Sequence, residues 1–209
     1  MARYKRSSKI TCYYILLKTF MLPINSARVS NRDALLDVLE SLIAEGSVHD
    51  VTLDGVAARA GITKGGLIYH FKSKEALLHG LLERMRARVD SHCVDPTLEP
   101  QQALRKFLIA RIHYAFAMGA KEKKIMANLL AAASSYPSLL VPVKSMYDNG
   151  TGNIASLGDS AGLALSVWTA LDGFVMLEML HIRQFSEQER QQMKDTLIAL
   201  VERQFPAPD

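Results

Sequence analysis

The chain has 209 residues, of which 49% are hydrophobic, and it carries a formal net charge of +4. This apolar content is enough for one or two packed domains, and seven prolines and twelve glycines are too few for a collagenous or a disordered chain. The two cysteines, Cys12 and Cys93, form no CxxC pair and join no histidine cluster, which argues against a disulfide scaffold or a zinc site and suits a cytoplasmic protein.

The basic charge lies mostly in the first twenty residues, which contain five lysines and arginines and no acidic residue. Without these five charges the chain is slightly acidic, so the overall charge does not by itself indicate nucleic-acid binding. The apolar run over 10–17 is short, Lys18 interrupts it and no cleavage site follows, which disfavours a secretory signal. The segment 1–29 is interpreted as a tail, either a flexible DNA-contacting arm or residues that precede a true start at Met21.

The first predicted helix begins at Ser30 and runs to about Ala44, with leucine and isoleucine side chains spaced three and four residues apart. Gly46 follows it, where a residue in the left-handed conformation commonly ends a helix. Serine and threonine cap helix N-termini well, because their hydroxyl oxygens accept hydrogen bonds from free backbone N–H groups. Such caps predict three more helices, with Thr52 before 53–60, Thr63 before 64–70 and Ser73 before 74–91.

Pro96 and Pro100 bracket a linker, after which five further helices are predicted. They span about 101–118, 122–134, 138–148, 160–182 and 186–204, with Pro142 expected to kink or shorten the third and glycines to make 149–158 a loop. No segment shows the alternation of a strand, so the chain is predicted to be all-α with about nine helices. The expected organisation is a tail (1–29), a three-helix helix-turn-helix domain (30–80) and a helical domain (81–205).

The segment 161–180 is apolar enough to imitate a membrane span, but it contains Asp172 and Glu178. A mid-span aspartate costs about 2.5 to 3.5 kcal/mol on insertion. A helix buried among other helices is therefore expected, and no membrane partner is predicted.

The segment 51–71 combines two short helices with a glycine-containing turn, which is the pattern of a helix-turn-helix motif. Three alanines allow its helices to cross closely, and Gly61 permits a turn that a β-carbon would strain. In such a motif the second helix lies in the major groove with its N-terminal end toward the bases. Lys64, Lys72 and Lys74 place three cations and no acid within 62–74, which suits contact with phosphates.

Residues 31–79 resemble the N-terminal domain of the tetracycline-repressor (TetR) family. The resemblance rests on the run Thr63-Lys-Gly-Gly-Leu-Ile-Tyr-His-Phe71, on Ser73-Lys-Glu-Ala-Leu-Leu78, and on Thr52, Ala57 and Ala60-Gly61. Gly66 and Ile68 depart from the family pattern in ways that are ordinary for it. The match covers about a quarter of the chain and is specific enough to predict DNA binding.

The resemblance implies a role for individual residues of this chain. Thr52 and Lys74 would anchor phosphates at helix starts, where backbone N–H groups assist. Phe71 is expected in the core. The residues expected at the groove or its rims are Thr63, Lys64, Gly65, Tyr69 and His70, with Arg28 and Arg32 reaching DNA from the start of the first helix.

The resemblance also implies a C-terminal domain that binds a ligand and forms a dimer. A two-fold homodimer is expected on physical grounds too, since one short recognition helix reads few base pairs, whereas two of them about 34–36 Å apart read the half-sites of a palindrome. The dimer interface is predicted at the last two helices, through Leu163, Phe174, Met193, Leu197, Leu200 and Val201.

A stripe on the helix over 101–118 is predicted to line an effector pocket, since methionine and aromatic side chains suit varied apolar molecules. Arg111 and Asp172 are the most pointed candidates, because a charge on an apolar helix needs a ligand, a side chain or water as partner. The predicted set is Arg111, Tyr114, Met118, Met126, Met146, Trp168, Asp172 and Met176, and the alternative is that these residues are simply core. The effector is expected to be apolar or cationic.

These features predict a repressor that binds a double-stranded DNA operator as a homodimer. A small molecule is expected to release it from DNA by changing the spacing of the two helix-turn-helix domains. The helix over 74–91 joins both domains and is expected to transmit the change. The alternative is an activator or coactivator of the same fold that acts through a protein partner. No catalytic site, metal site or cofactor is expected, since 150–155 matches G-x-G-x-x-A without the preceding strand that a dinucleotide site needs.

Overall fold

The computed structural model describes residues 31–93, 97–155 and 158–207, and every regular element in these ranges is helical. Nine α-helices and three short 3-10 turns follow one another in these ranges, which confirms the predicted all-α class. The tail over 1–29, Arg28, the expected cap Ser30 and Pro96 lie outside the described residues.

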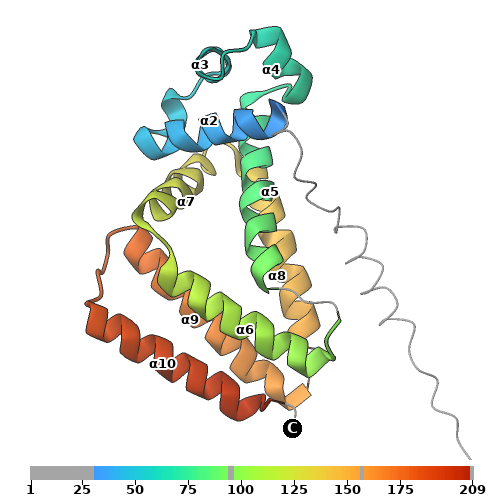
Figure 1. Ribbon diagram of the computed structural model, residues 1–209, viewed down its shortest axis with the longest axis vertical. Coiled ribbons are helices and arrows are strands. Elements are labelled where there is room, and N and C mark those ends of the chain that lie inside the picture. The colour runs from blue at the N-terminus through green and yellow to red at the C-terminus, as the bar shows by residue number, and fades with distance from the viewer. Residues whose placement is uncertain (1–30, 94–96, 156–157, 208–209) are drawn as a thin grey trace, which may run out of the picture.

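Residues 31–80 form a unit at one end of the molecule, which we call the reading head (Figure 1). It contains α2 (Asn31–Glu45), η1 (Val48–Asp50), α3 (Leu53–Arg59), α4 (Lys64–His70) and the first turns of α5 (Lys74–Cys93). Its core is built from large side chains that are at most 1% exposed, among them Leu36, Leu39, Ile43, Leu67, Leu77 and Leu81. Burial of each such side chain stabilises the fold by about 1.5 to 3 kcal/mol.

The remaining helices form a second core below the reading head (Figure 1). They are α6 (Pro100–Ala117), α7 (Ala120–Ala132), α8 (Leu140–Ala155), α9 (Ala161–Met179) and α10 (Glu187–Gln204), with η2 (Pro137–Leu139) and η3 (Gly158–Ser160) between them. α9 packs against α6, α7, α8 and α10. This central position explains why α9 is the most apolar of the helices that the structure describes.

Helix α7 connects the two cores. Ile125 and Leu129 are buried in the core of the reading head, while α7 also packs on α9. The side-chain amide of Asn128 donates hydrogen bonds to the carbonyl oxygens of Ile43 at 2.9 Å and Gly46 at 3.0 Å. Carbonyl groups at a helix end have no partner within the helix, so α7 supplies the cap for α2.

The structure corrects three local expectations. Gly46 is not left-handed, because Asn128 and the ordinary helical bond from Gly46 N–H to Leu42 cap the end of α2 instead. The predicted loop over 149–158 is wrong up to Ala155, since α8 continues past Gly150. Pro142 lies in the first turn of α8, where its missing N–H removes no helical hydrogen bond and produces no break.

Candidate nucleic-acid interface and effector site

Threonine caps begin both helices of the helix-turn-helix motif. The hydroxyl oxygen of Thr52 accepts a hydrogen bond from Gly55 N–H at 3.0 Å, and that of Thr63 accepts one from Gly66 N–H at 3.1 Å. Between the helices, Gly61 has a φ of +69°, a conformation that a β-carbon disfavours. Local interactions therefore fix the turn between α3 and α4, as the sequence indicated.

One side of α4 is buried and the other is open. Leu67 is fully buried, and Phe71 directly after the helix is 3% exposed, which confirms its expected place in the core. Tyr69 is 86% exposed, and the ring of His70 packs edge-on against it with centroids 5.1 Å apart. The other groove-facing residues expected from the sequence are exposed beside it: Thr63, Lys64 and Gly65.

The two lysines assigned to DNA are held differently. Lys64 donates a hydrogen bond at 2.9 Å to the carboxylate of Asp54, and both side chains are more than half exposed. Lys74 donates at 3.1 Å to the carbonyl oxygen of His49, and burial lowers the pKa of its ammonium group below the ordinary value. Lys64 is thus at the surface with an acidic neighbour, while Lys74 also ties η1 to the start of α5.

Arg32 lies at the start of α2, with its guanidinium 5.0 Å from the centroid of the Phe71 ring. Gly80 of α5 makes this arrangement possible, because a β-carbon there would lie 2.7 Å from Phe71 and 3.4 Å from Arg32. The stacking orients an exposed cation at the rim of the reading head.

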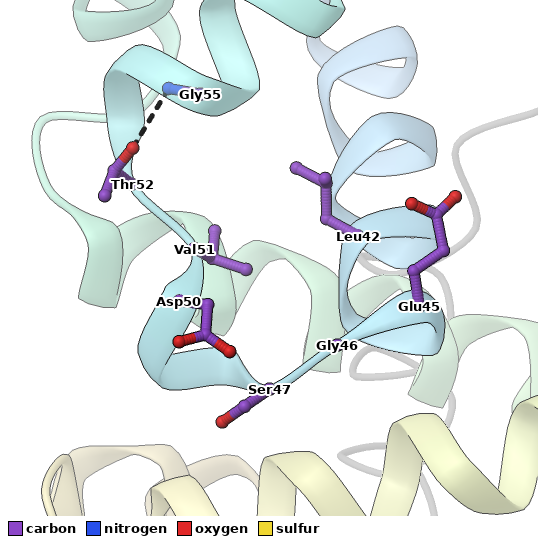
Figure 2. Close-up of a pocket in the computed structure, with 8 residues that line it drawn as sticks. All are labelled: Leu42, Glu45, Gly46, Ser47, Asp50, Val51, Thr52 and Gly55. Carbon is purple, nitrogen blue, oxygen red and sulfur yellow. Dashed lines mark hydrogen bonds between the residues drawn. The ribbon is translucent and has the colours of Figure 1, made fainter.

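A hollow of about 300 Å³ lies between the end of α2 and the start of α3 (Figure 2). Glu45 and Asp50 line it, together with Thr52, whose hydroxyl is already occupied by Gly55 N–H. Arg59 pairs with Glu45 through two hydrogen bonds of 2.6 and 2.7 Å. The carboxylates make this hollow unsuitable for a DNA phosphate.

Four residues from three helices meet in the second core, and we call them the donor cluster: Arg111 of α6, Tyr147 of α8, and Trp168 and Asp172 of α9. Arg111 donates to Asp172 at 3.4 Å, and the Tyr147 hydroxyl donates to the other carboxylate oxygen at 2.5 Å. Burial raises the pKa of Asp172, although the Tyr147 hydrogen bond and the Arg111 charge act in the opposite direction. Asp172 and Arg111 are thus each other's partners, and Tyr147 is a member that the sequence pattern did not reveal.

The other residues predicted to line the pocket differ in their exposure and in their contacts. Met118 is buried, and Met126 and Met146 are partly buried against the same core. The Tyr114 hydroxyl donates a hydrogen bond to Glu122, and burial raises the pKa of this phenol. Met176 is 46% exposed, and it lies one helical turn after Asp172 on α9.

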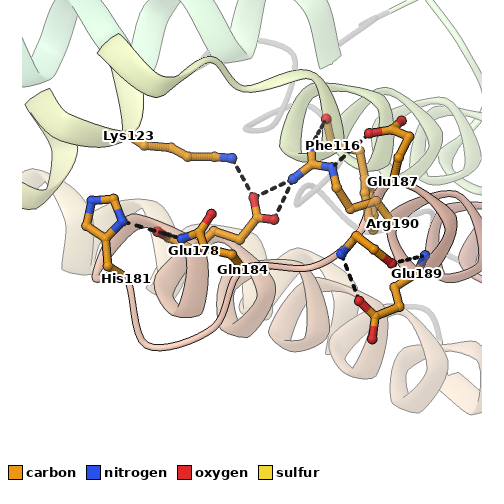
Figure 3. Close-up of polar contacts among 9 residues, drawn as sticks. Phe116, Lys123, Glu178, His181, Gln184, Glu187, Glu189 and Arg190 are labelled. Carbon is orange, nitrogen blue, oxygen red and sulfur yellow. Dashed lines mark hydrogen bonds and ion pairs between the residues drawn. The ribbon is translucent and has the colours of Figure 1, made fainter.

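A second polar centre surrounds Glu178, which is 3% exposed (Figure 3). Lys123 of α7 and Arg190 of α10 each approach its carboxylate to 2.5 Å. Arg190 also donates to the carbonyl oxygen of Phe116 at the end of α6. The sequence indicated this centre only through Glu178, an acidic residue on an apolar helix. It did not predict that Lys123 and Arg190 are the partners of Glu178.

Two of the six residues predicted at the dimer interface are buried inside the protomer. Phe174 is 6% exposed and stacks on Phe116 with centroids 4.3 Å apart, and Val201 is fully buried. The other four are half-buried: Leu163, Met193, Leu197 and Leu200. Large exposed apolar side chains on and directly after α9 are Met176, Leu180 and Ile182.

Two family profiles match this chain. One, described as bacterial regulatory proteins, tetR family, matches residues 35–81, and the other, described as tetracyclin repressor-like, C-terminal domain, matches residues 105–202. Together the two matches cover more than half of the 209 residues.

Individual proteins agree with these profiles. The HTH-type transcriptional repressor KstR2 of Mycobacterium tuberculosis is 35% identical over 85 residues, which span 39% of this chain and only 42% of that protein. The HTH-type transcriptional regulator RutR of Escherichia coli O157:H7 is 24% identical over 161 residues, covering 73% of this chain and 68% of that protein. A solved transcriptional regulator from Rhodococcus sp. superposes with a TM-score of 0.61 at 18% identity, covering 87% of this chain and 100% of that one, and so has the same fold.

Proposed function

Because the chain belongs to the tetracycline-repressor (TetR) family of bacterial regulatory proteins, we propose that it is a sequence-specific DNA-binding transcriptional repressor. It binds a palindromic operator as a homodimer and is released by a small molecule. The observation that carries the proposal is the open side of α4, where Tyr69 and Lys64 face solvent while Leu67 anchors the helix in the core.

The proposed DNA contacts fall into two classes, those in the major groove and those to phosphates at its rim. Thr63, Gly65 and Tyr69 lie where α4 enters the major groove, and there they contact base edges and flanking phosphates. Lys64 and Arg32 neutralise phosphates at the rim of the reading head, and such contacts position the protein without reading sequence. The further contacts assigned by the resemblance are Arg28, Thr52, His70 and Lys74.

The two-fold interface forms on the outer face of α9, next to α10. Gly162, Ser166, Thr169 and Met176 are exposed and follow one face of the helix at spacings of three, four and seven, and Leu180 continues this face. The small residues allow a partner helix to approach closely, and Met176 and Leu180 supply apolar surface. The half-buried residues of α10 predicted from the sequence, such as Leu200, lie at the border of this interface.

α9 is also long and apolar enough to cross a membrane by length and composition. Its two acidic side chains are paired within the protein, Asp172 with Arg111 and Glu178 with Arg190. These pairs and the contacts of α9 with four other helices support a core helix. We therefore propose a cytoplasmic regulator that has no membrane partner and no enzymatic activity.

In vitro selection from a random DNA duplex library with the full-length chain tests this function. A palindrome with half-sites one helical turn apart should be enriched, and a reporter gene placed behind it should be silenced. Affinity for this duplex, measured by fluorescence anisotropy, should fall steeply as salt rises. Tyr69→Ala and Lys64→Ala should weaken binding, whereas the control Lys144→Ala on α8 should not. Enrichment of no common sequence would contradict the proposal.

A further inference from the structure

The donor cluster contains more hydrogen-bond donors than acceptors. Its acceptor is the carboxylate of Asp172, and three donor groups from α6, α8 and α9 surround it. The guanidinium of Arg111 carries five N–H donors, yet within the described part of the chain it reaches one acceptor, and at 3.4 Å that contact is long.

The indole N–H of Trp168 is also poorly satisfied. Trp168 is 5% exposed, and its nitrogen is buried without a hydrogen bond of acceptable geometry. It is nevertheless near enough to Asp172 and to the Tyr147 hydroxyl to favour their charged forms, although burial outweighs this effect and raises the pKa of both groups. A buried donor without a partner costs about 1 to 3 kcal/mol, so an added acceptor within reach of the indole would recover this cost.

Aromatic rings surround these donors. Tyr147 stacks on Trp168 with centroids 5.4 Å apart, and Phe107 packs edge-on against the same indole at 5.7 Å. Gly150 of α8 lies directly against the indole, where a β-carbon would come within 2.1 Å. Aromatic side chains therefore border the donors, so a ligand that enters by displacing Asp172 would meet aromatic rings, and this favours an aromatic ring as the body of the ligand.

We propose that the donor cluster binds an aromatic carboxylate, whose carboxylate group replaces that of Asp172 in front of Arg111, Tyr147 and Trp168. The proposal rests on the function proposed above, since it names the chemical class of the effector. It differs from the apolar or cationic ligand expected from the sequence, because a cation here would face the guanidinium of Arg111. An arginine binds a carboxylate with two parallel hydrogen bonds, which Asp172 does not achieve at 3.4 Å.

Displacement of Asp172 would also change the contact between α8 and α9. The hydrogen bond from Tyr147 to Asp172 ties α8 to α9. Once a ligand accepts the hydrogen bond from Tyr147, this tie is lost. Ligand binding thereby loosens α8 from α9, the helix to which we assign the dimer interface.

The chain has a single tryptophan, so the fluorescence of Trp168 in the full-length protein reports directly on this site. Three probes share a phenyl ring and differ in the attached group: phenylacetate, phenylacetamide and phenethylammonium. Phenylacetate should change the emission saturably and bind at least about tenfold more tightly than the other two, because hydrogen bonds to a charged group are the stronger ones. Equal binding of the amide, or tighter binding of the ammonium, would overturn the proposal.

Variants test the assignment residue by residue. Arg111→Gln and Tyr147→Phe should each raise the Kd for phenylacetate by roughly tenfold or more, and Tyr147→Phe keeps the ring that packs on Trp168. Arg105→Gln is the matched control, because Arg105 lies on α6 like Arg111 but pairs with Glu202 of α10, and it should leave the Kd unchanged. An unchanged Kd in Tyr147→Phe would refute the site.

Operator binding is measured separately by anisotropy without any probe. Operator binding without a response of Trp168 to phenylacetate would overturn the effector class and leave the repressor function standing. A saturable response of Trp168 with no sequence-specific DNA binding would instead support the ligand site and contradict the repressor function.

Discussion

Glu178 of α9 and Arg190 of α10 form a buried ion pair in which both carboxylate oxygens lie 2.5 Å from one guanidinium nitrogen (Figure 3). Glu178→Gln removes the buried negative charge and leaves Arg190 and Lys123 with only the exposed Glu187, 3.9 Å from Arg190, as a counter-charge. We expect the free energy of unfolding to fall by about 3 kcal/mol, measured by urea denaturation. Glu202→Gln breaks an exposed pair with Arg105 and should cost less than about 1 kcal/mol.

The same carboxylate predicts a pH dependence of stability. Burial alone would raise the pKa of Glu178, but hydrogen bonds from Arg190 and Lys123 outweigh it and hold the pKa below its ordinary value. A carboxyl with a lowered pKa in the folded state stabilises the protein above its unfolded-state pKa, and this contribution is lost as pH falls through the folded-state pKa. The free energy of unfolding should therefore decline below about pH 4.3, the ordinary glutamate value. A decline of equal size in Glu178→Gln would contradict this assignment.

Asp54 limits the positive charge at the start of α4, because its carboxylate pairs with Lys64 at 2.9 Å. Asp54→Asn should free Lys64 for a phosphate and tighten operator binding about two- to fivefold, since an exposed pair is worth up to about 1 kcal/mol. The slope of log K against log salt should steepen by about one. Asp195→Asn makes the same change on α10 and should alter neither quantity, and a weaker complex with Asp54→Asn would show that Asp54 itself supports DNA binding.

Asn128 caps the last turn of α2 from α7, through two backbone carbonyl oxygens. Asn128→Ala should lower the free energy of unfolding by about 1 to 2 kcal/mol, and hydrogen exchange should quicken at the end of α2. Asn128→Asp should cost more, because a carboxylate would face these carbonyl oxygens and the negative end of the helix dipole. The neighbouring Lys124→Ala, at an exposed position of α7, is the control. Equal stability of the alanine and aspartate variants would argue against the cap.

Gly150 lets α8 approach the indole of Trp168, so a methyl group at this position should disturb the second core. Gly150→Ala adds a β-carbon 2.1 Å from the indole, and overpacking of this kind costs about 1 to 3 kcal/mol. A gain in helix propensity of up to about 1 kcal/mol offsets part of this cost. The melting temperature should fall and the emission of Trp168 should shift. Gly65→Ala, whose β-carbon meets its nearest atom at 3.9 Å, should not lower the melting temperature, and a rise in Gly150→Ala would contradict the close packing.

The sequence by itself determined the reading head and the helical class. Thr52, Thr63 and Gly61 act on residues three or fewer positions away, so the caps and the turn follow from local order along the chain. The apolar spacing of 31–45 and 74–93 likewise predicts their buried faces, because that spacing is a property of one helix alone.

Tertiary structure decided how distant residues combine. Tyr147 hydrogen-bonds to Asp172, which is 25 positions away in the sequence, and Lys123 pairs with Glu178, which is 55 positions away. The periodicity within one helix does not predict such pairs. Likewise, the indole of Trp168 packs against Gly150 of α8, and Phe116 of α6 stacks on Phe174 and helps to bury it. Local spacing shows which face of a helix is apolar, but only the packing of helices decides which neighbour that face meets.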